Sequence, residues 1–188
     1  MKFCSIQLNN ELDIALRAYN YEEGAINRND LIKKIEAAHN ELDSQGFCIL
    51  KDVIPIELIK EAKAYYTHKR DQRKLFFSND VVVGMNNFSA NYFGKYTRHF
   101  EFLWNKHYNK RFFAAMLELH AIRNYITGYT ALLGLVNNPS DNMVYLAITE
   151  YESGQGKMNR HVDPNNFLPT HFNVPLTKFG DDFFEGGL

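Results

Sequence analysis

Three segments in the first part of the chain carry apolar residues three or four positions apart, the spacing of one face of an α-helix. They run from about Asp30 to Asp43, onward from Pro55, and from about Lys110 to Leu133. Pro55 suits the first turn of a helix, because the N–H that it lacks has no partner there. The apolar positions are Leu31, Ile35, Ala38 and Leu42; Leu58, Ile59, Ala62, Tyr65 and Tyr66; and Phe112, Phe113, Met116, Leu119, Ile122 and Ile126. We expect three amphipathic helices.

Strand patterns gather after residue 140. Residues 143–151 form an apolar run, and apolar and polar residues alternate over 172–177, which predicts a strand with one apolar face. Gly46, which can end the first helix, precedes a shorter expected strand at 47–50. The helix patterns thus precede most of the strand patterns along the chain. This order predicts an α+β fold, with helices buttressing one face of a β-roll.

Composition is that of an ordinary globular domain. The chain has 188 residues, of which 45% are hydrophobic and 23% charged, so we expect one domain over residues 1–188. Residues 1–140 would form a mainly helical support with one short strand, and 141–188 the first half of the β-roll. We expect a small-molecule or peptide partner, no nucleic acid at a net charge of −1, and no membrane. Two cysteines, Cys4 and Cys48, imply no disulfide framework and fit the cytoplasm.

Two local features allow more than one interpretation. Residues 85–108 are rich in aromatic side chains, which either pack the helices against the roll or form a loop that lines a substrate site. A basic cluster, Lys69, Arg70, Arg73 and Lys74, is either a solvated helix end or a surface for an anionic substrate.

The strongest candidate chemistry is a pair of metal-binding side chains, His161 and Asp163. Two positions apart on an extended strand, their side chains point to the same face and can share one ion. An imidazole nitrogen and a carboxylate oxygen suit a divalent first-row metal, as in the set of two histidines and one carboxylate that binds non-haem iron(II). Gly154 and Gly156 allow a tight loop between the strand at 143–151 and this pair.

This order of parts resembles the iron(II)- and 2-oxoglutarate-dependent oxygenases, within them the prolyl-hydroxylase-like branch. The residues that carry the likeness are a strand ending at Tyr151, the glycine-bearing loop, Arg160-His-Val-Asp163, Pro175-Leu-Thr177 and Gly186-Gly-Leu188. Residues 46–55 are more loosely similar to the strand and helix start that precede the core of that family. The resemblance implies a double-stranded β-helix, a jelly roll of the cupin-like kind, with helices on its N-terminal side.

The resemblance also implies an enzyme with assigned residues. His161 and Asp163 would be the iron ligands and catalytic residues, and Tyr151 would line the 2-oxoglutarate pocket, with Tyr145 as a second cofactor-binding residue. The enzyme would be an oxidoreductase that hydroxylates an unidentified peptide or small molecule and releases succinate and CO2. Its cofactors would be iron(II) and 2-oxoglutarate, with ascorbate as an additional reductant. A more distal His and an Arg or Lys complete the site in the family, and the sequence given stops at Leu188 before either.

A double-stranded β-helix needs eight strands, and residues 143–188 offer about three and the start of a fourth. Either these residues are the N-terminal part of a longer polypeptide, or a partner supplies the remainder, or the chain is a degenerate member that has lost the chemistry. The alternative function is therefore a non-catalytic β-roll protein for binding or assembly, completed by another chain.

A third hypothesis is a zinc metallohydrolase that uses His161, Asp163 and His171. We expect the remaining histidines to be surface or hydrogen-bonded packing residues, because they lack metal-type spacing: His39, His68, His99, His107 and His120. Asp181 and Asp182 are expected in a solvated turn similar to the acidic loop before the Gly-Gly of the family.

Overall fold

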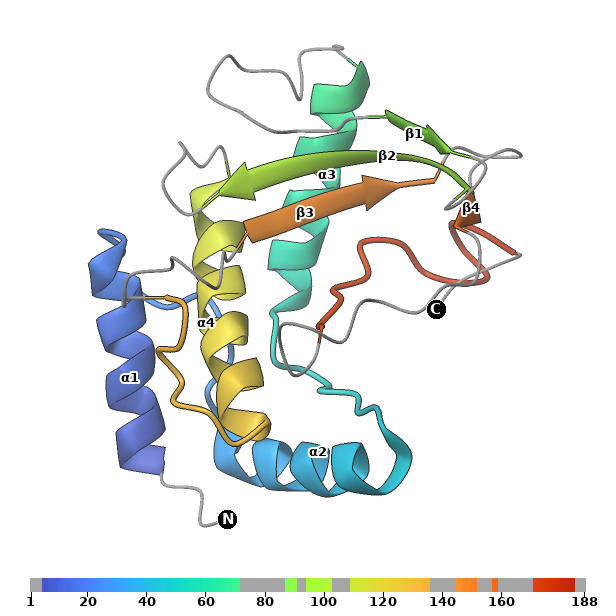
Figure 1. The fold of residues 1–188 in the computed structure, drawn as a ribbon. Helices are drawn as coiled ribbons and strands as arrows, with labels where there is room; N and C mark the ends of the chain where they lie inside the picture. Colours follow the sequence, from blue (N-terminus) through green and yellow to red (C-terminus); the bar gives the residue numbers. More distant parts are fainter. Residues whose placement is uncertain are drawn as a thin grey trace. The chain divides into compact units, whose positions relative to one another are not determined.

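A computed structural model describes residues 5–71, 87–90, 94–102, 109–135, 145–151, 157–158 and 171–184. These residues form four helices and four strands (Figure 1). In chain order they are α1 (Ser5–Ala18), α2 (Leu31–Gln45), α3 (Ile56–Asp71), β1 (Asn87–Ala90), β2 (Gly94–Phe102), α4 (Lys110–Ile126), β3 (Tyr145–Glu150) and β4 (Lys157–Met158).

The chain divides into two units, each built from segments that are distant in sequence. Of the described residues, unit 1 contains those up to Glu61, those from 109 to 135 and those from 171 to 174. Unit 2 contains those from 62 to 102, from 145 to 158 and from 175 to 184. The N-terminal end of α3 thus belongs to unit 1 and the rest of that helix to unit 2.

Helix α4 is the centre of unit 1. Helix α1 lies along it and α2 packs against it (Figure 1). Helix α4 is buried on nearly every side, with Phe112, Phe113, Leu117 and Ile122 at most 1% exposed. Burial all round is the property of a helix that is covered by others, so the core of unit 1 forms around α4.

The three helices expected from the sequence are confirmed, and their ends have local causes. Helix α2 ends where Gly46 adopts a φ of +79° and donates its N–H to the carbonyl of Leu42 at 2.9 Å. Helix α3 begins directly after Pro55. Helix α4 begins at an Asn109 cap, whose side chain accepts from the N–H of Phe112 at 3.1 Å. It ends at Ile126 rather than 133, since Gly128 turns the chain with a φ of +85°.

The sequence pattern did not lead us to expect α1, although the signal is present. Its buried residues are Leu8, Leu12, Ala15 and Leu16, each at most 2% exposed. They are four, three and one positions apart, which is one stripe on a helix. Polar residues such as Asn9 and Asn10 surround this stripe and make the segment resemble a polar start of the chain.

The strands form one antiparallel sheet in unit 2. Strand β2 is central: β1 pairs with its residues 94–97 on one edge, and β3 pairs with its residues 97–102 on the other. Strand β4 pairs with Gly94 and Lys95, so it continues along the edge that β3 occupies. The predicted strand at 143–151 is therefore confirmed as β3, whereas β1 and β2 were not expected as strands.

Two other expected strands are absent among the described residues. Residues 47–50 are not in a sheet, and Phe47 and Ile49 are 60% and 66% exposed. Residues 172–177 are likewise not a strand, although Phe172, Val174 and Leu176 are each less exposed than their neighbours. The alternation correctly predicted which side chains are covered, but covering one face does not require strand pairing. The β-helix fold stays a prediction, because residues 159–170 and 185–188 lie outside the described residues.

A buried carboxylate joins the layers of unit 1. Glu118 of α4 is fully buried and accepts from the main-chain N–H groups of Ala25 and Ile26, at 2.7 and 3.1 Å. Its Oε1 also accepts from Nε and Nη2 of Arg28, at 3.0 and 2.8 Å. Arg28 then donates from Nη1 to Asp13 of α1 at 2.8 Å. The loop before α2 is thereby fastened to both α4 and α1.

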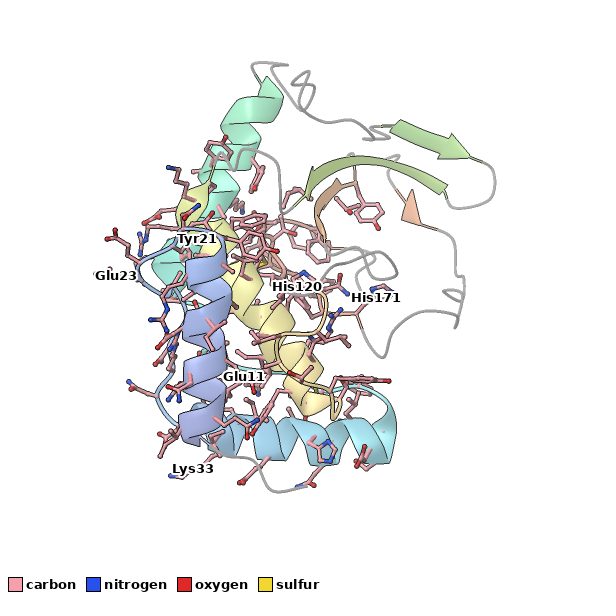
Figure 2. The ribbon with its side chains drawn as sticks, turned by 60° about the vertical axis from the view of Figure 1, so that its left-hand side comes forward. Glu11, Tyr21, Glu23, Lys33, His120 and His171 are labelled. Carbon is pink, nitrogen blue, oxygen red and sulfur yellow. The ribbon has the colours of Figure 1, made fainter. Side chains whose placement is uncertain are left out.

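The end of α4 is fastened in a similar way by polar groups. Asn124 is fully buried and donates from Nδ2 to the carbonyls of Ala131 and Leu133, at 3.1 and 2.8 Å. Glu11 of α1, labelled in Figure 2, accepts from the N–H of Ala131 at 3.0 Å, and Tyr19 donates its hydroxyl to the carbonyl of Leu135. The turn at 131–135 therefore has its main chain satisfied from α4 and α1.

We expect Glu118→Gln to lower the free energy of unfolding by about 3–5 kcal/mol, because it removes the buried partner of an ion pair and leaves Arg28 with only the half-exposed carboxylate of Asp13. Urea unfolding at neutral pH measures this loss. Glu61→Gln is the matched control, since Glu61 also pairs with an arginine, Arg111 at 2.9 Å, but both side chains are about half or more exposed, at 49% and 65%. It should cost at most about 1 kcal/mol. Equal losses in the two variants would show that burial of the Glu118 pair is not what stabilises unit 1.

Candidate functional site

The predicted iron ligands, His161 and Asp163, lie outside the described residues, as do Gly154 and Gly156. Among the described residues, no group of three or more His, Cys, Asp or Glu side chains is placed to hold a metal ion. The metal motif therefore stays a prediction, and the structure describes its approach along the chain.

That approach contains two strand segments, β3 and β4, which both pair with β2. Strand β3 pairs antiparallel with β2, from Tyr145 opposite Phe102 to Glu150 opposite Thr97. Tyr151 follows directly and is 44% exposed. The chain then returns to the same edge of β2 as β4, with Lys157 opposite Lys95. The glycine-bearing segment 152–156 thus separates two pairings with one strand, and the His161 motif follows three residues after β4.

The two predicted cofactor residues are at opposite ends of β3. Tyr145 begins the strand and Tyr151 follows its last residue. Because they are six positions apart, an even number, a regular strand would place them on the same face of the sheet. This spacing is compatible with two side chains that line one wall of a pocket. The structure describes the main chain of both residues.

His171, the third ligand in the metallohydrolase hypothesis, is exposed and belongs to unit 1. The next residue, Phe172, packs edge-to-face on the imidazole of His120 in α4, with ring centroids 4.8 Å apart. Figure 2 shows His120 on α4 and His171 on the neighbouring segment. His39 forms a packing hydrogen bond, as expected, because its Nδ1 donates to the carbonyl of Ile126 at 2.9 Å.

Asp181 and Asp182 lie in a turn, as predicted, and the turn is stabilised by two lysines. Asp182 accepts from Nζ of Lys63 in α3 and from the main-chain N–H of Lys178 at 2.8 Å. Nζ of Lys178 bonds to Asp181, also at 2.8 Å. The hydrogen bond from Lys63, then that from Lys178, hold the pKa of Asp182 below its usual value of 3.8. The two aspartates thus hold the turn to Lys63 and Lys178, which agrees with the expectation of a structural, solvated turn.

The other candidate regions are described only in their main chain. Lys69 and Arg70 end α3, and Arg73 and Lys74 lie outside the described residues, so both interpretations of the basic cluster stay open. The aromatic segment forms β1 and β2 over 87–90 and 94–102, and therefore is not a continuous loop there.

Sequence reasoning missed the polar groups inside unit 1. Glu118, Asn124, Arg28 and Arg123 combine burial with hydrogen bonding, and Glu118 and Asn124 are fully buried. The available signal was an acid in the middle of an apolar helical run, Ala114-Ala-Met-Leu-Glu118-Leu119. Burial tends to lower the pKa of Arg28, and its bonds to Asp13 and Glu118 outweigh burial, so the net shift is upward. Arg28 is therefore firmly cationic and suited to the pair with Glu118.

One candidate nucleophile is unfavourable. Cys48 is half-buried, and its burial, with the nearby charge of Glu41, raises the pKa of the thiol above 9.0. Since the thiolate is the reactive form, Cys48 is a poor nucleophile at neutral pH.

Comparison of the chain with models of protein families, with curated proteins and with solved structures gives no match. Among the described residues, no helix is both long enough and apolar enough to cross a lipid bilayer.

We expect Asp182→Asn to destabilise the protein at neutral pH and to have no effect in strong acid. A carboxyl group whose pKa is lowered by folding stabilises the folded state above its unfolded pKa, and this contribution is lost as the pH falls through the lowered folded value. Chemical unfolding of both proteins between pH 7 and about pH 2 measures the difference. Asp181→Asn is the control, because the carboxylate of Asp181 pairs with Lys178 where both side chains are largely exposed. A wild-type advantage over Asp182→Asn that grows in acid would contradict the assignment.

Proposed function

We propose that the chain is part of an iron(II)- and 2-oxoglutarate-dependent oxygenase that hydroxylates a peptide or small molecule. The observation that carries the proposal is the His161-Val-Asp163 motif, which follows a strand, Tyr151 and a glycine-bearing segment in the order typical of the prolyl-hydroxylase-like branch. Strand β3, which ends at Glu150 just before Tyr151, supports this order.

The donor set fits the metal. One imidazole and one carboxylate are two of the three protein ligands that non-haem iron(II) sites use, and they bind a hard-to-intermediate divalent ion without a thiolate. His161 and Asp163 would hold iron(II), and a distal His beyond Leu188 would complete the set. When bound, iron and 2-oxoglutarate supply the oxidation, in which one oxygen atom of O2 enters succinate and the other the hydroxylated product, with loss of CO2.

The remaining residues of the approach would bind and orient. In this proposal Tyr151 and Tyr145 would each donate a hydroxyl to the carboxylates of 2-oxoglutarate, which are acceptors for such donors. The aromatic rings would also exclude water from the reacting atoms. Since the chain has only two cysteines and no disulfide framework, we place this activity in the cytoplasm.

A second candidate, a non-catalytic assembly protein, is favoured by the sheet. Among the described strands, β3 has β2 as its only neighbour, so its other edge has no partner there. An open edge presents main-chain N–H and C=O groups to which a strand of another chain can add. This protein would use the roll as a docking frame and would need no metal.

Calorimetric titration of the full chain with Mn²⁺, or with Fe²⁺ under anaerobic conditions, measures metal binding and so tests the oxygenase proposal. We expect Asp163→Ala to weaken binding of the ion at least about 100-fold. Loss of a residue that only hydrogen-bonds to a metal ligand already lowers metal affinity about 10–100-fold, and Asp163 would be a ligand itself. The same substitution should also abolish the formation of succinate from 2-oxoglutarate. This assay uses the polypeptide together with any residues that are encoded after Leu188.

The control is His171→Ala, which should leave Mn²⁺ affinity unchanged in an oxygenase. If this variant instead lost affinity, and the wild type bound Zn²⁺ with no use of 2-oxoglutarate, the metallohydrolase would replace the oxygenase. No uptake of any of these ions by well-folded protein, together with a stable complex with another chain, would favour the assembly protein.

A further inference from the structure

Arg123 differs from the other interior cation of unit 1 in having no acidic partner. Its Nε and Nη2 both donate to Oδ1 of Asn124, at 3.1 and 2.7 Å. Among the described residues, no carboxylate forms an ion pair with it, whereas Arg28 has both Glu118 and Asp13. The only acceptor of Arg123 is thus a neutral amide oxygen.

This arrangement leaves a charge partly compensated. Arg123 is half-buried on α4, and its burial lowers the pKa of the guanidinium. A guanidinium nevertheless keeps its proton at any ordinary pH, so it cannot escape the cost by becoming neutral. The last turn of α4 offers the partial negative charge of a helix end, which is about half an elementary charge. A bound anion would complete the compensation.

The geometry of Arg123 leaves donors available for that anion. A guanidinium has five N–H groups, and two nitrogens are directed at one Asn124 oxygen, so Nη1 has no acceptor among the described residues. Asn124 is itself fixed by its bonds to the carbonyls of Ala131 and Leu133, so it holds the fork in one orientation. A fixed fork with free N–H groups matches the oxygen spacing of carboxylates and phosphates.

The described acids of α4 and α1 already have partners: Glu118 and Asp13 bond to Arg28, and Glu11 accepts from the N–H of Ala131. One turn before Arg123 is His120, whose ring is covered by Phe172, and residues three apart are neighbours on a helix surface. His171, next to Phe172, is exposed. A small anion would reach Arg123 from solvent through the exposed part of this half-buried side chain.

We propose that Arg123, oriented by Asn124, is a binding site for an oxyanion, either a small-molecule carboxylate or a phosphate. The site is in unit 1 and uses none of the residues of the metal motif, so it stands or falls independently of the oxygenase. The anion would compensate the charge of Arg123 as Glu118 compensates that of Arg28.

The test is an NMR titration of the full chain that follows the Nε–H signal of Arg123 and the amides of α4. Succinate and inorganic phosphate are added separately, and sodium chloride at equal ionic strength is the reference. We expect a saturable shift with at least one of the two, and binding at least about tenfold weaker in Arg123→Gln. Saturation with succinate identifies a carboxylate site, and saturation with phosphate alone identifies a phosphate site.

Two variants keep the result interpretable. Arg111→Gln removes an exposed arginine of the same helix and should bind as the wild type does. Arg123→Lys keeps the charge but loses the fork, and should bind more weakly than the wild type, so it tests the site even if Arg123→Gln folds poorly. Chloride-like shifts with both probes, or equal binding in wild type, Arg123→Lys and Arg111→Gln, would overturn the proposal.

Discussion

Burial of the Glu118 carboxylate constrains unit 1 more than any single apolar contact does. A carboxylate without water must receive several hydrogen bonds, and Glu118 obtains them from two main-chain N–H groups and from Arg28. These donors come from residues about 90 positions away in the sequence, so the central helix and the loop before α2 have to form together. Hydrophobic burial favours many arrangements of three helices, whereas a satisfied buried charge favours one.

The helical part of the fold could be predicted because its signal is local. A stripe of apolar residues, a Pro in the first turn and a Gly after the last are properties of ten to twenty consecutive residues, and they predicted α2, α3 and the start of α4 correctly. Strand pairing depends on distant partners, which explains the errors at 47–50 and 172–177. Both segments have the composition of strands, but neither has a neighbouring strand among the described residues. Strands β1 and β2 were missed because their aromatic residues fit a loop interpretation equally well.

The candidate site could be predicted in its chemistry and not in its assembly. His161 and Asp163 are recognisable because two ligand types at a spacing of two suggest one ion, and that inference needs only the sequence. Arg123 and Asn124 carry no such spacing. Their significance depends on which side chains lie nearby after folding, and an arginine without a carboxylate near it becomes notable only when its surroundings are known. Local motifs therefore suggest metal sites more readily than they suggest single-cation sites.

The contacts of Glu118 with the loop before α2 also limit which loop positions can change during evolution. Ala25 and Ile26 bond to Glu118 through their main-chain N–H groups, so these two hydrogen bonds do not depend on the side chain at either position. Gly24 has no such freedom, since a β-carbon there would lie 2.5 Å from Oε1 of Glu118 and 3.0 Å from Nη2 of Arg28. In a lineage that keeps this helical unit, we expect Gly24, Arg28 and Glu118 to be inherited together as a triplet.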